Sequence, residues 1–113
     1  MLSSEGDRRL PAIRQGLDHL VHSADPDPSA VERLRVEVHG LRGAAMVIGE
    51  SRLAELADRI ERAIAERIEP GTIDSPLAAR LTAAVDALGE GVVAAAQGDP
   101  EPPSLAESLG SLG

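Results

Sequence analysis

Residues 39–49 read His-Gly-Leu-Arg-Gly-Ala-Ala-Met-Val-Ile-Gly, and this stretch decides the fold. Its apolar residues recur with a helical period, so it predicts the second half of an amphipathic helix. The helix should end at Gly49, because glycine suits the left-handed conformation that follows many helices. Gly40 and Gly43 nevertheless lie inside the helix, where each glycine costs roughly 1 kcal/mol relative to alanine. We infer that a requirement other than helix stability selects these two glycines.

The helical period also places His39 on the solvent side. At about 100° per residue, the apolar residues cluster on the opposite face: Leu34, Val38, Leu41, Ala45 and Ile48. Gly43, one turn after His39, removes the side chain that would lean over the imidazole. Arg42 brings a fixed positive charge and a planar donor fork beside the ring. An exposed imidazole with a bare patch and a cation next to it suits a phosphoryl group carried on nitrogen.

A second amphipathic helix is predicted directly after this stretch, from about Glu50 to Arg67. The short turn at Gly49 makes the two helices antiparallel neighbours. Residues whose numbers sum to about 100 should then lie opposite each other. Glu61 therefore faces His39 in the predicted hairpin.

One further helix precedes this hairpin. Ser4 or Asp7 can cap its start, and the Asp-Pro-Asp-Pro connection at residues 25–28 follows its end. The first helix of the hairpin then begins at Ser29, because Glu32 three residues later completes a capping-box pattern.

A last helix follows the hairpin. Ser75 with Pro76 opens it, and it reaches about Gln97. The final ten residues, 104–113, are too short to form a stable helix on their own. We therefore expect an all-α fold with three parts: a loose N-terminus at residues 1–7, an antiparallel up-down-up-down four-helix bundle at residues 8–97, and a flexible Pro/Gly linker or tail at residues 98–113.

The amino-acid composition limits the possible fold classes and the possible classes of function. The 113 residues include no Phe, Trp or Tyr, so the core must be built from aliphatic ridges in grooves, which favours a helical bundle. The absence of cysteine excludes disulfides and thiolate metal sites. A net charge of −8 and the lack of stacking aromatics argue against nucleic acid. No apolar run reaches the ~18–20 residues of a membrane span, and no signal peptide is seen. We expect a soluble, cytoplasmic protein.

The motif resembles the histidine phosphotransfer (HPt) domains of two-component signalling, closest to those of chemotaxis-type and pilus-type histidine kinases. The residues that carry the resemblance are His39, Leu41, Arg42, Gly43 and Gly49, followed by Leu53, Leu56, Ile60 and Glu61. The resemblance covers about residues 8–97. It implies that His39 accepts a phosphoryl group and that Glu61 orients the imidazole. Arg42 stands where the family usually has Lys, and Gly40 where a hydroxyl residue or Ala is commoner.

These inferences predict a phosphorelay carrier. His39 would accept a phosphoryl group, at Nε2, from a histidine kinase or receiver domain and pass it to an aspartate of a response-regulator receiver domain. Glu61 would accept a hydrogen bond from Nδ1–H, and Arg42 would offset charge on the phosphoryl oxygens. No acidic cluster for a metal and no glycine-rich phosphate loop accompany His39. We therefore expect no metal site and no intrinsic cofactor, with Mg²⁺ and ATP supplied by partner domains.

The surroundings of His39 predict a docking surface for the receiver. Its residues are Arg35, Val36, Met46 and Val47. The three apolar ones are either a docking patch or the edge of the core. Arg35 either contacts phosphate or forms a salt bridge with Glu32 or Glu37. The isolated domain should be monomeric, because the bundle closes its own core.

Some alternatives stay open. Glu61 could be an ordinary solvated carboxylate paired with Arg59 or Arg62. The whole domain could be a non-catalytic interaction module that docks a receiver or kinase without phosphotransfer, although the presence of His39 argues against this. His19 and His22 are interpreted as plain residues of the first helix. A helical metal-carboxylate enzyme is set aside, because no histidine follows a glutamate at three residues.

Overall fold

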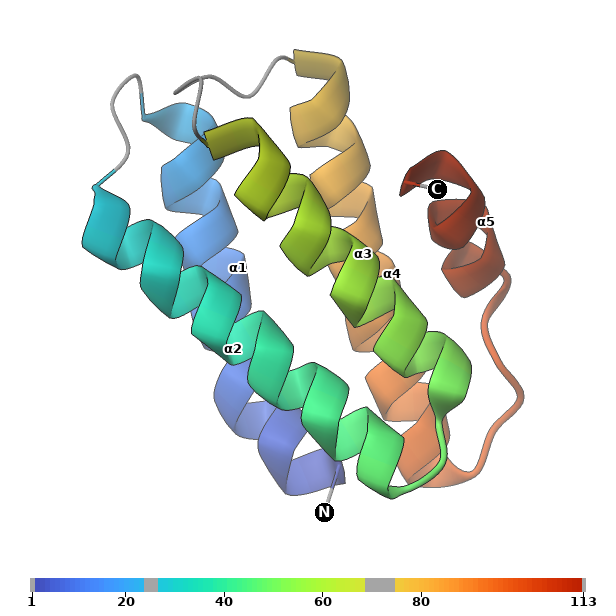
Figure 1. Ribbon diagram of the computed structural model, residues 1–113. Helices are drawn as coiled ribbons and strands as arrows, with labels where there is room; N and C mark the ends of the chain where they lie inside the picture. The colour runs from blue at the N-terminus through green and yellow to red at the C-terminus, as the bar shows by residue number, and fades with distance from the viewer. Residues whose placement is uncertain (1, 24–26, 69–74, 113) are drawn as a thin grey trace.

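The computed structural model describes the backbone of residues 2–23, 27–68 and 75–112. These residues form five helices and no strand (Figure 1). The helices are α1 (Leu2–His22), α2 (Pro28–Val47), α3 (Ser51–Ile68), α4 (Ser75–Gln97) and α5 (Pro103–Leu112). The all-α prediction is confirmed, but the expected number of four helices is corrected to five. Within the described ranges, no helix combines the length and the apolar character needed to cross a membrane.

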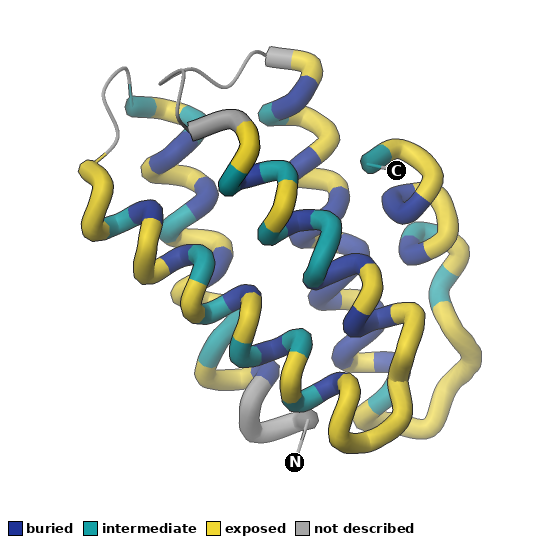
Figure 2. Tube along the Cα trace, in the orientation of Figure 1, coloured by how far each residue is buried: buried dark blue, intermediate teal, exposed yellow. Residues whose placement is uncertain are grey.

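The first four helices surround a common core. α1 contacts α2 and α4, and α3 contacts the same two helices, so the four close a ring. Figure 1 shows consecutive helices of this ring running in alternating directions. Figure 2 shows the buried positions on the sides where the helices face one another. The largest fully buried side chains are all aliphatic, as a chain without aromatic residues requires: Ile13, Leu34, Leu41, Leu56, Ile60, Ile64, Leu81, Leu88 and Val38.

The N-terminus differs from the expectation. α1 begins at Leu2, so residues 2–7 are helical rather than loose, and Ser4 and Asp7 lie inside the helix instead of capping it. The physical reason is packing against α4. Gly6 is buried, and a Cβ added there would lie 2.5 Å from Cγ1 of Val92. Helices gain most of their stability from such tertiary contacts.

The start of α2 also differs from the prediction. The N-cap is Asp27, and Pro28 occupies the first helical turn, so the capping box predicted at Ser29 and Glu32 is wrong. The Asp27 carboxylate accepts hydrogen bonds from the backbone N–H and from the hydroxyl of Ser29, both at 3.0 Å. These bonds lower the pKa of the Asp27 carboxyl below its ordinary value, with smaller contributions from nearby Arg33 and His19. Pro28 suits the first turn because no partner awaits its missing N–H.

The turn between α2 and α3 follows the prediction. Gly49 has φ of +83°, which confirms the left-handed residue expected there. Its N–H donates to the carbonyl of Met46 at 3.1 Å, and the Glu50 N–H donates to Ala45 at 2.9 Å. These two bonds form a Schellman motif, which ends α2 and turns the chain back within three residues.

The predicted flexible tail is wrong for residues 103–112, which form α5. α5 packs on α3 and α4, and its Leu105 and Leu109 are buried. A helix of ten residues is marginal alone, but burial of two leucines stabilises it here. Three polar contacts join α5 and the residues just before it to the bundle. Arg59 Nη1 donates to the Leu109 carbonyl (2.5 Å), and the Ser104 hydroxyl donates to Glu90 (2.6 Å). Arg52 pairs with Glu101, which precedes α5 (2.7 Å).

Candidate functional site

His39 stands on the outer face of α2. Its side chain is 63% exposed, whereas Val38 and Leu41 on the same helix are fully buried. The outward orientation predicted from the helical period is therefore confirmed. Gly43 lies one turn further along, and a Cβ added there would meet no described atom within 4 Å beyond its chain neighbours and the adjacent backbone of its own helix. The space beside the imidazole is thus open to solvent.

Glu61 on α3 faces the imidazole, as the hairpin register predicts. Its Oε1 atom lies 3.3 Å from Nδ1 of His39, and its side chain is 19% exposed. The two arginines that were considered as alternative partners each pair with the carboxylate one turn before them, Arg59 with Glu55 (2.7 Å) and Arg62 with Asp58 (3.1 Å). Glu61 is therefore directed at His39.

Arg42 is directed toward α3. Its side chain is half-buried, and its Nε atom lies 3.9 Å from Oδ1 of Asp58. The Arg42–Asp58 and His39–Glu61 pairs have the same residue-number sum, so one antiparallel register forms both. Asp58 was not among the residues predicted from the sequence, although its number and that of Arg42 also sum to 100.

Arg35 lies one turn before His39 and forms an ion pair. Its Nη1 atom is 3.3 Å from Oε2 of Glu32, which selects one of the alternatives considered above. Its Nε atom is buried and has no hydrogen-bond partner among the described residues. Glu37, the other candidate partner, instead pairs with Arg9 of α1 at 3.3 Å.

The contact between Arg9 and Gly40 was not anticipated. A Cβ added at Gly40 would collide with the guanidinium of Arg9, which is largely buried where α1 crosses α2. Gly40 therefore leaves room for the Arg9 guanidinium to approach α2 closely. The unexplained mid-helix glycine was the available signal, but nothing in the sequence identified the residue that approaches it.

Four exposed apolar residues lie along α2 and just beyond its end. We call them the apolar patch: Val36, Met46, Val47 and Ile48, which are 54%, 57%, 86% and 45% exposed. Ile48 had been expected on the buried face. It is exposed because the last residue of α2 is Val47, and Ile48, with φ of −93° and ψ of 2°, no longer follows the helical period.

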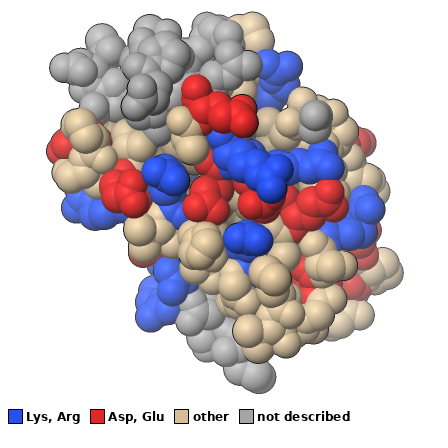
Figure 3. Space-filling view, viewed as in Figure 1, with Lys and Arg blue, Asp and Glu red and all other residues tan. Residues whose placement is uncertain are grey.

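Charges of both signs cover the face formed by α2 and α3. Figure 3 shows arginine and carboxylate side chains intermixed across this face. The ion pairs described above account for this pattern, with Arg35, Arg42, Arg59 and Arg62 each opposed by a carboxylate. In the part of the chain that the structure describes, no group of three or more histidines and carboxylates could hold a metal ion.

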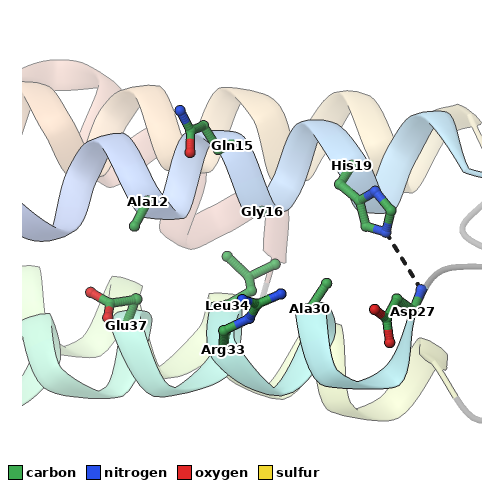
Figure 4. Close-up of a pocket in the computed structure, with 9 residues that line it drawn as sticks. All are labelled: Ala12, Gln15, Gly16, His19, Asp27, Ala30, Arg33, Leu34 and Glu37. Atoms are coloured by element: carbon green, nitrogen blue, oxygen red, sulfur yellow. Dashed lines mark hydrogen bonds between the residues drawn. The ribbon is translucent and has the colours of Figure 1, made fainter.

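A groove of about 460 Å³ runs between α1 and α2 (Figure 4). His19 lies at one end of it, where its Nε2 atom is 3.4 Å from the backbone N–H nitrogen of Asp27. On the α2 side the groove is lined by Arg33, Leu34 and Glu37, and Gly16 lines it on the α1 side. His39 and Glu61 do not line this groove. His19 therefore contacts the start of α2 and stands apart from the site around His39.

Comparison with known families bears on the site directly. The model of the Hpt domain family matches residues 1–91, which include α1, α2, α3 and most of α4. His39, Arg42, Asp58 and Glu61 all lie inside the match, whereas α5 lies outside it. No curated protein matches the chain.

Proposed function

Because the chain belongs to the Hpt domain family of histidine phosphotransfer modules in two-component signalling, we propose that it is a phosphorelay carrier. It accepts a phosphoryl group on Nε2 of His39 and passes it to an aspartate of a response-regulator receiver domain. One observation carries this proposal: an imidazole that is 63% exposed has a carboxylate oxygen of Glu61 3.3 Å from its Nδ1 atom.

Glu61 sets the tautomer that the reaction needs. When it accepts a hydrogen bond from Nδ1–H, the lone pair remains on Nε2, the ring nitrogen on the other side of the imidazole. This lone pair attacks the phosphorus of the donor, and the bond from phosphorus to the donor oxygen breaks with its electrons leaving on that oxygen. The product is a phosphorylated imidazolium whose Nδ1–H still points to Glu61. Transfer to the receiver aspartate reverses these changes, so no proton has to leave the ring.

Arg42 and Gly43 supply the remaining requirements. Phosphoryl transfer depends mainly on in-line positioning and charge neutralisation. The Arg42 guanidinium can neutralise phosphoryl oxygens through paired N–H donors. The absence of a side chain at Gly43 leaves room for the phosphoryl group and for the donor or acceptor that approaches it.

The apolar patch supports the assignment of a partner. It flanks His39 along α2, and exposed apolar clusters of this kind commonly mark protein interfaces. We assign it to the docking of a receiver domain, with His39 lying along α2 between Val36 and the other three residues. A histidine kinase domain would bring ATP and Mg²⁺. By resemblance to chemotaxis-type and pilus-type kinases, the chain works in the cytoplasm as a monomeric carrier or as one domain of such a kinase.

The alternative is a module that docks a receiver or kinase without phosphotransfer. The apolar patch alone would serve that function equally well. The placement of Glu61 favours transfer, because a docking surface has no need of a carboxylate directed at Nδ1.

Phosphorylation by a small donor tests the proposal without a partner protein. We expect phosphoramidate to phosphorylate the wild-type chain and give an acid-labile, alkali-stable product, whereas His39→Gln should give none. The chain has three histidines and no other aromatic residue, so its imidazole NMR signals can be followed without overlap from other rings. Only the His39 signals should change strongly on phosphorylation. Equal labelling of the wild type and His39→Gln would reject the proposal.

Glu61→Ala provides the second arm. Loss of the orienting carboxylate should slow phosphorylation between about tenfold and a hundredfold, while far-UV circular dichroism shows unchanged helix content. His22→Gln is the matched control for His39→Gln, because His22 is also an exposed imidazole, on α1, and contacts Asp18. Unchanged kinetics in Glu61→Ala would remove Glu61 from the mechanism.

A further inference from the structure

Asp58 is a carboxylate beside the site to which the proposed reaction assigns no role. Its side chain is 23% exposed and lies on α3 one turn before Glu61, on the flank that faces α2. Its two oxygens contact two arginines from different helices. Oδ1 lies 3.9 Å from Nε of Arg42 on α2, and Oδ2 lies 3.1 Å from Nε of Arg62 on α3.

The two contacts differ in strength. The Asp58–Arg62 pair joins residues four apart on one helix, and it does not depend on what happens at α2. The Asp58–Arg42 contact is at the outer limit of an ion pair, and no hydrogen bond joins these two side chains in the described structure. Arg42 can therefore leave Asp58 without breaking a hydrogen bond and loses only the attraction of the charge, and Asp58 then keeps Arg62 as its partner.

We propose that Asp58 is a positioning residue that competes with the phosphoryl group on His39 for Arg42, an inference that rests on the proposed function. In the unphosphorylated protein, Asp58 attracts the guanidinium toward α3. After phosphorylation, the dianionic phosphoryl group offers three strong acceptor oxygens, and Arg42 moves to them. This exchange lowers the net stabilisation that Arg42 gives to the phosphohistidine. The reason is that Arg42 loses its contact with Asp58 when it forms its contact with the phosphoryl group.

This competition suits a carrier. A phosphoryl group that is bound too tightly would stay on His39, whereas a carrier must release it to the next aspartate. Asp58 would therefore set how strongly the phosphohistidine is stabilised, without touching the reacting atoms. Removing the charge of Asp58 should free Arg42 and make the phosphohistidine more stable.

The test measures the equilibrium between phosphoramidate and the intact protein. In this reaction the P–N bond of phosphoramidate breaks, ammonia leaves, and a P–N bond to His39 forms. At a fixed ratio of phosphoramidate to ammonia, the NMR signals of His39 report the phosphorylated fraction. We expect Asp58→Asn to raise the equilibrium constant about threefold to tenfold. Asp58→Glu, which keeps the charge, should stay nearer the wild-type value.

A double-mutant cycle separates this competition from simple charge repulsion. Asp58 could also disfavour the phosphoryl group directly as a nearby negative charge, and that effect would not need Arg42. In the Arg42→Gln background, Asp58→Asn should change the equilibrium constant by less than about twofold if Asp58 acts through Arg42. The same shift in both backgrounds would overturn the inference.

Two further variants test the same inference, one with the opposite expected effect and one as a control. Arg62→Gln leaves Asp58 with Arg42 as its one arginine partner of the two. Asp58 should then hold Arg42 more strongly, so the equilibrium constant for phosphorylation should fall. This variant tests the inference if Asp58→Asn fails to fold. Glu55→Gln is the matched control, because it removes an equal charge from α3 at a residue that pairs with Arg59. An unchanged constant in both Asp58→Asn and Arg62→Gln would overturn the inference while leaving the carrier function intact. A wild-type chain that takes no phosphoryl group would instead refute the proposed function itself.

Discussion

Two glycines of α2 illustrate how neighbouring residues can be selected for different reasons. Gly43 faces open space beside His39, and an added Cβ would meet no described atom within 4 Å beyond its chain neighbours and the adjacent helix backbone. Gly40 faces α1, and an added Cβ would collide with the guanidinium of Arg9. The first glycine therefore keeps access to the imidazole, and the second allows the partly buried Arg9 to pack against α2.

The stability of single variants should separate these two roles. Gly43→Ala should raise the free energy of unfolding by up to about 1 kcal/mol, because alanine is the better helix former and no collision results. Gly40→Ala should gain less or lose stability, because the Arg9 guanidinium must move away from Glu37. Urea unfolding followed by far-UV circular dichroism measures both variants. An equal gain in the two would contradict the packing of Arg9 on Gly40.

At the scale of the element, the two ends of α2 determine where His39 lies. Asp27 caps the N-terminus through its two hydrogen bonds with Ser29. The Schellman motif at Gly49 ends the helix and begins the return of the chain to α3. Both ends are set by hydrogen bonds between residues close in sequence, at Asp27 through its side chain and at Gly49 through the backbone, so the position of His39 depends on short-range features of the sequence.

The cap makes the stability of α2 depend on pH. The pKa of Asp27 is lowered in the folded protein, chiefly by its hydrogen bonds with Ser29. Its stabilising effect is therefore present above the ordinary pKa of an aspartate and is lost as the pH falls through the lowered folded value. Asp27→Ala should lower the thermal unfolding midpoint at neutral pH, and the difference from wild type should narrow in acid. Asp27→Asn, which retains an acceptor oxygen, is the control and should lose less. A pH-independent difference between wild type and Asp27→Ala would contradict this assignment.

At the scale of the whole molecule, α5 completes the core on the side away from α2. Within the described chain it contacts α3 and α4 but not α1 or α2 (Figure 1). It also lies outside the region that the Hpt family model matches. Its contribution should therefore be to the stability of the bundle rather than to the chemistry at His39.

Truncation of a buried leucine in α5 tests this division. Leu105 is 3% exposed, and Leu105→Ala should lower the free energy of unfolding by about 2–3 kcal/mol. Phosphorylation of His39 by phosphoramidate should stay at the wild-type rate while the variant is folded. Glu107→Ala, an exposed change on the same helix, is the control and should alter neither quantity. A slower phosphorylation in Leu105→Ala would show that α5 influences the site.

The features that depend on the helical period of the sequence and on contacts between neighbouring helices of one hairpin could be predicted from the sequence. The outward direction of His39, the turn at Gly49 and the proximity of Glu61 to His39 follow from a helical period and one hairpin. The same reasoning failed for α5, because a propensity for isolated helices ignores burial against α3 and α4. It also missed Arg9, because a contact between α1 and α2 leaves no spacing pattern in the sequence. Asp58 was within reach of the hairpin register and was overlooked.

The tight turn at Gly49 has a consequence for how this chain can evolve. It joins His39 and Glu61 through a continuous path of 22 positions, most of which are helical. Adding or deleting a single residue in a helical part of this path would rotate everything beyond it by about 100° and carry the carboxylate off the imidazole. Substitutions within the segment can therefore accumulate, but its length should stay invariant among descendants that keep the chemistry.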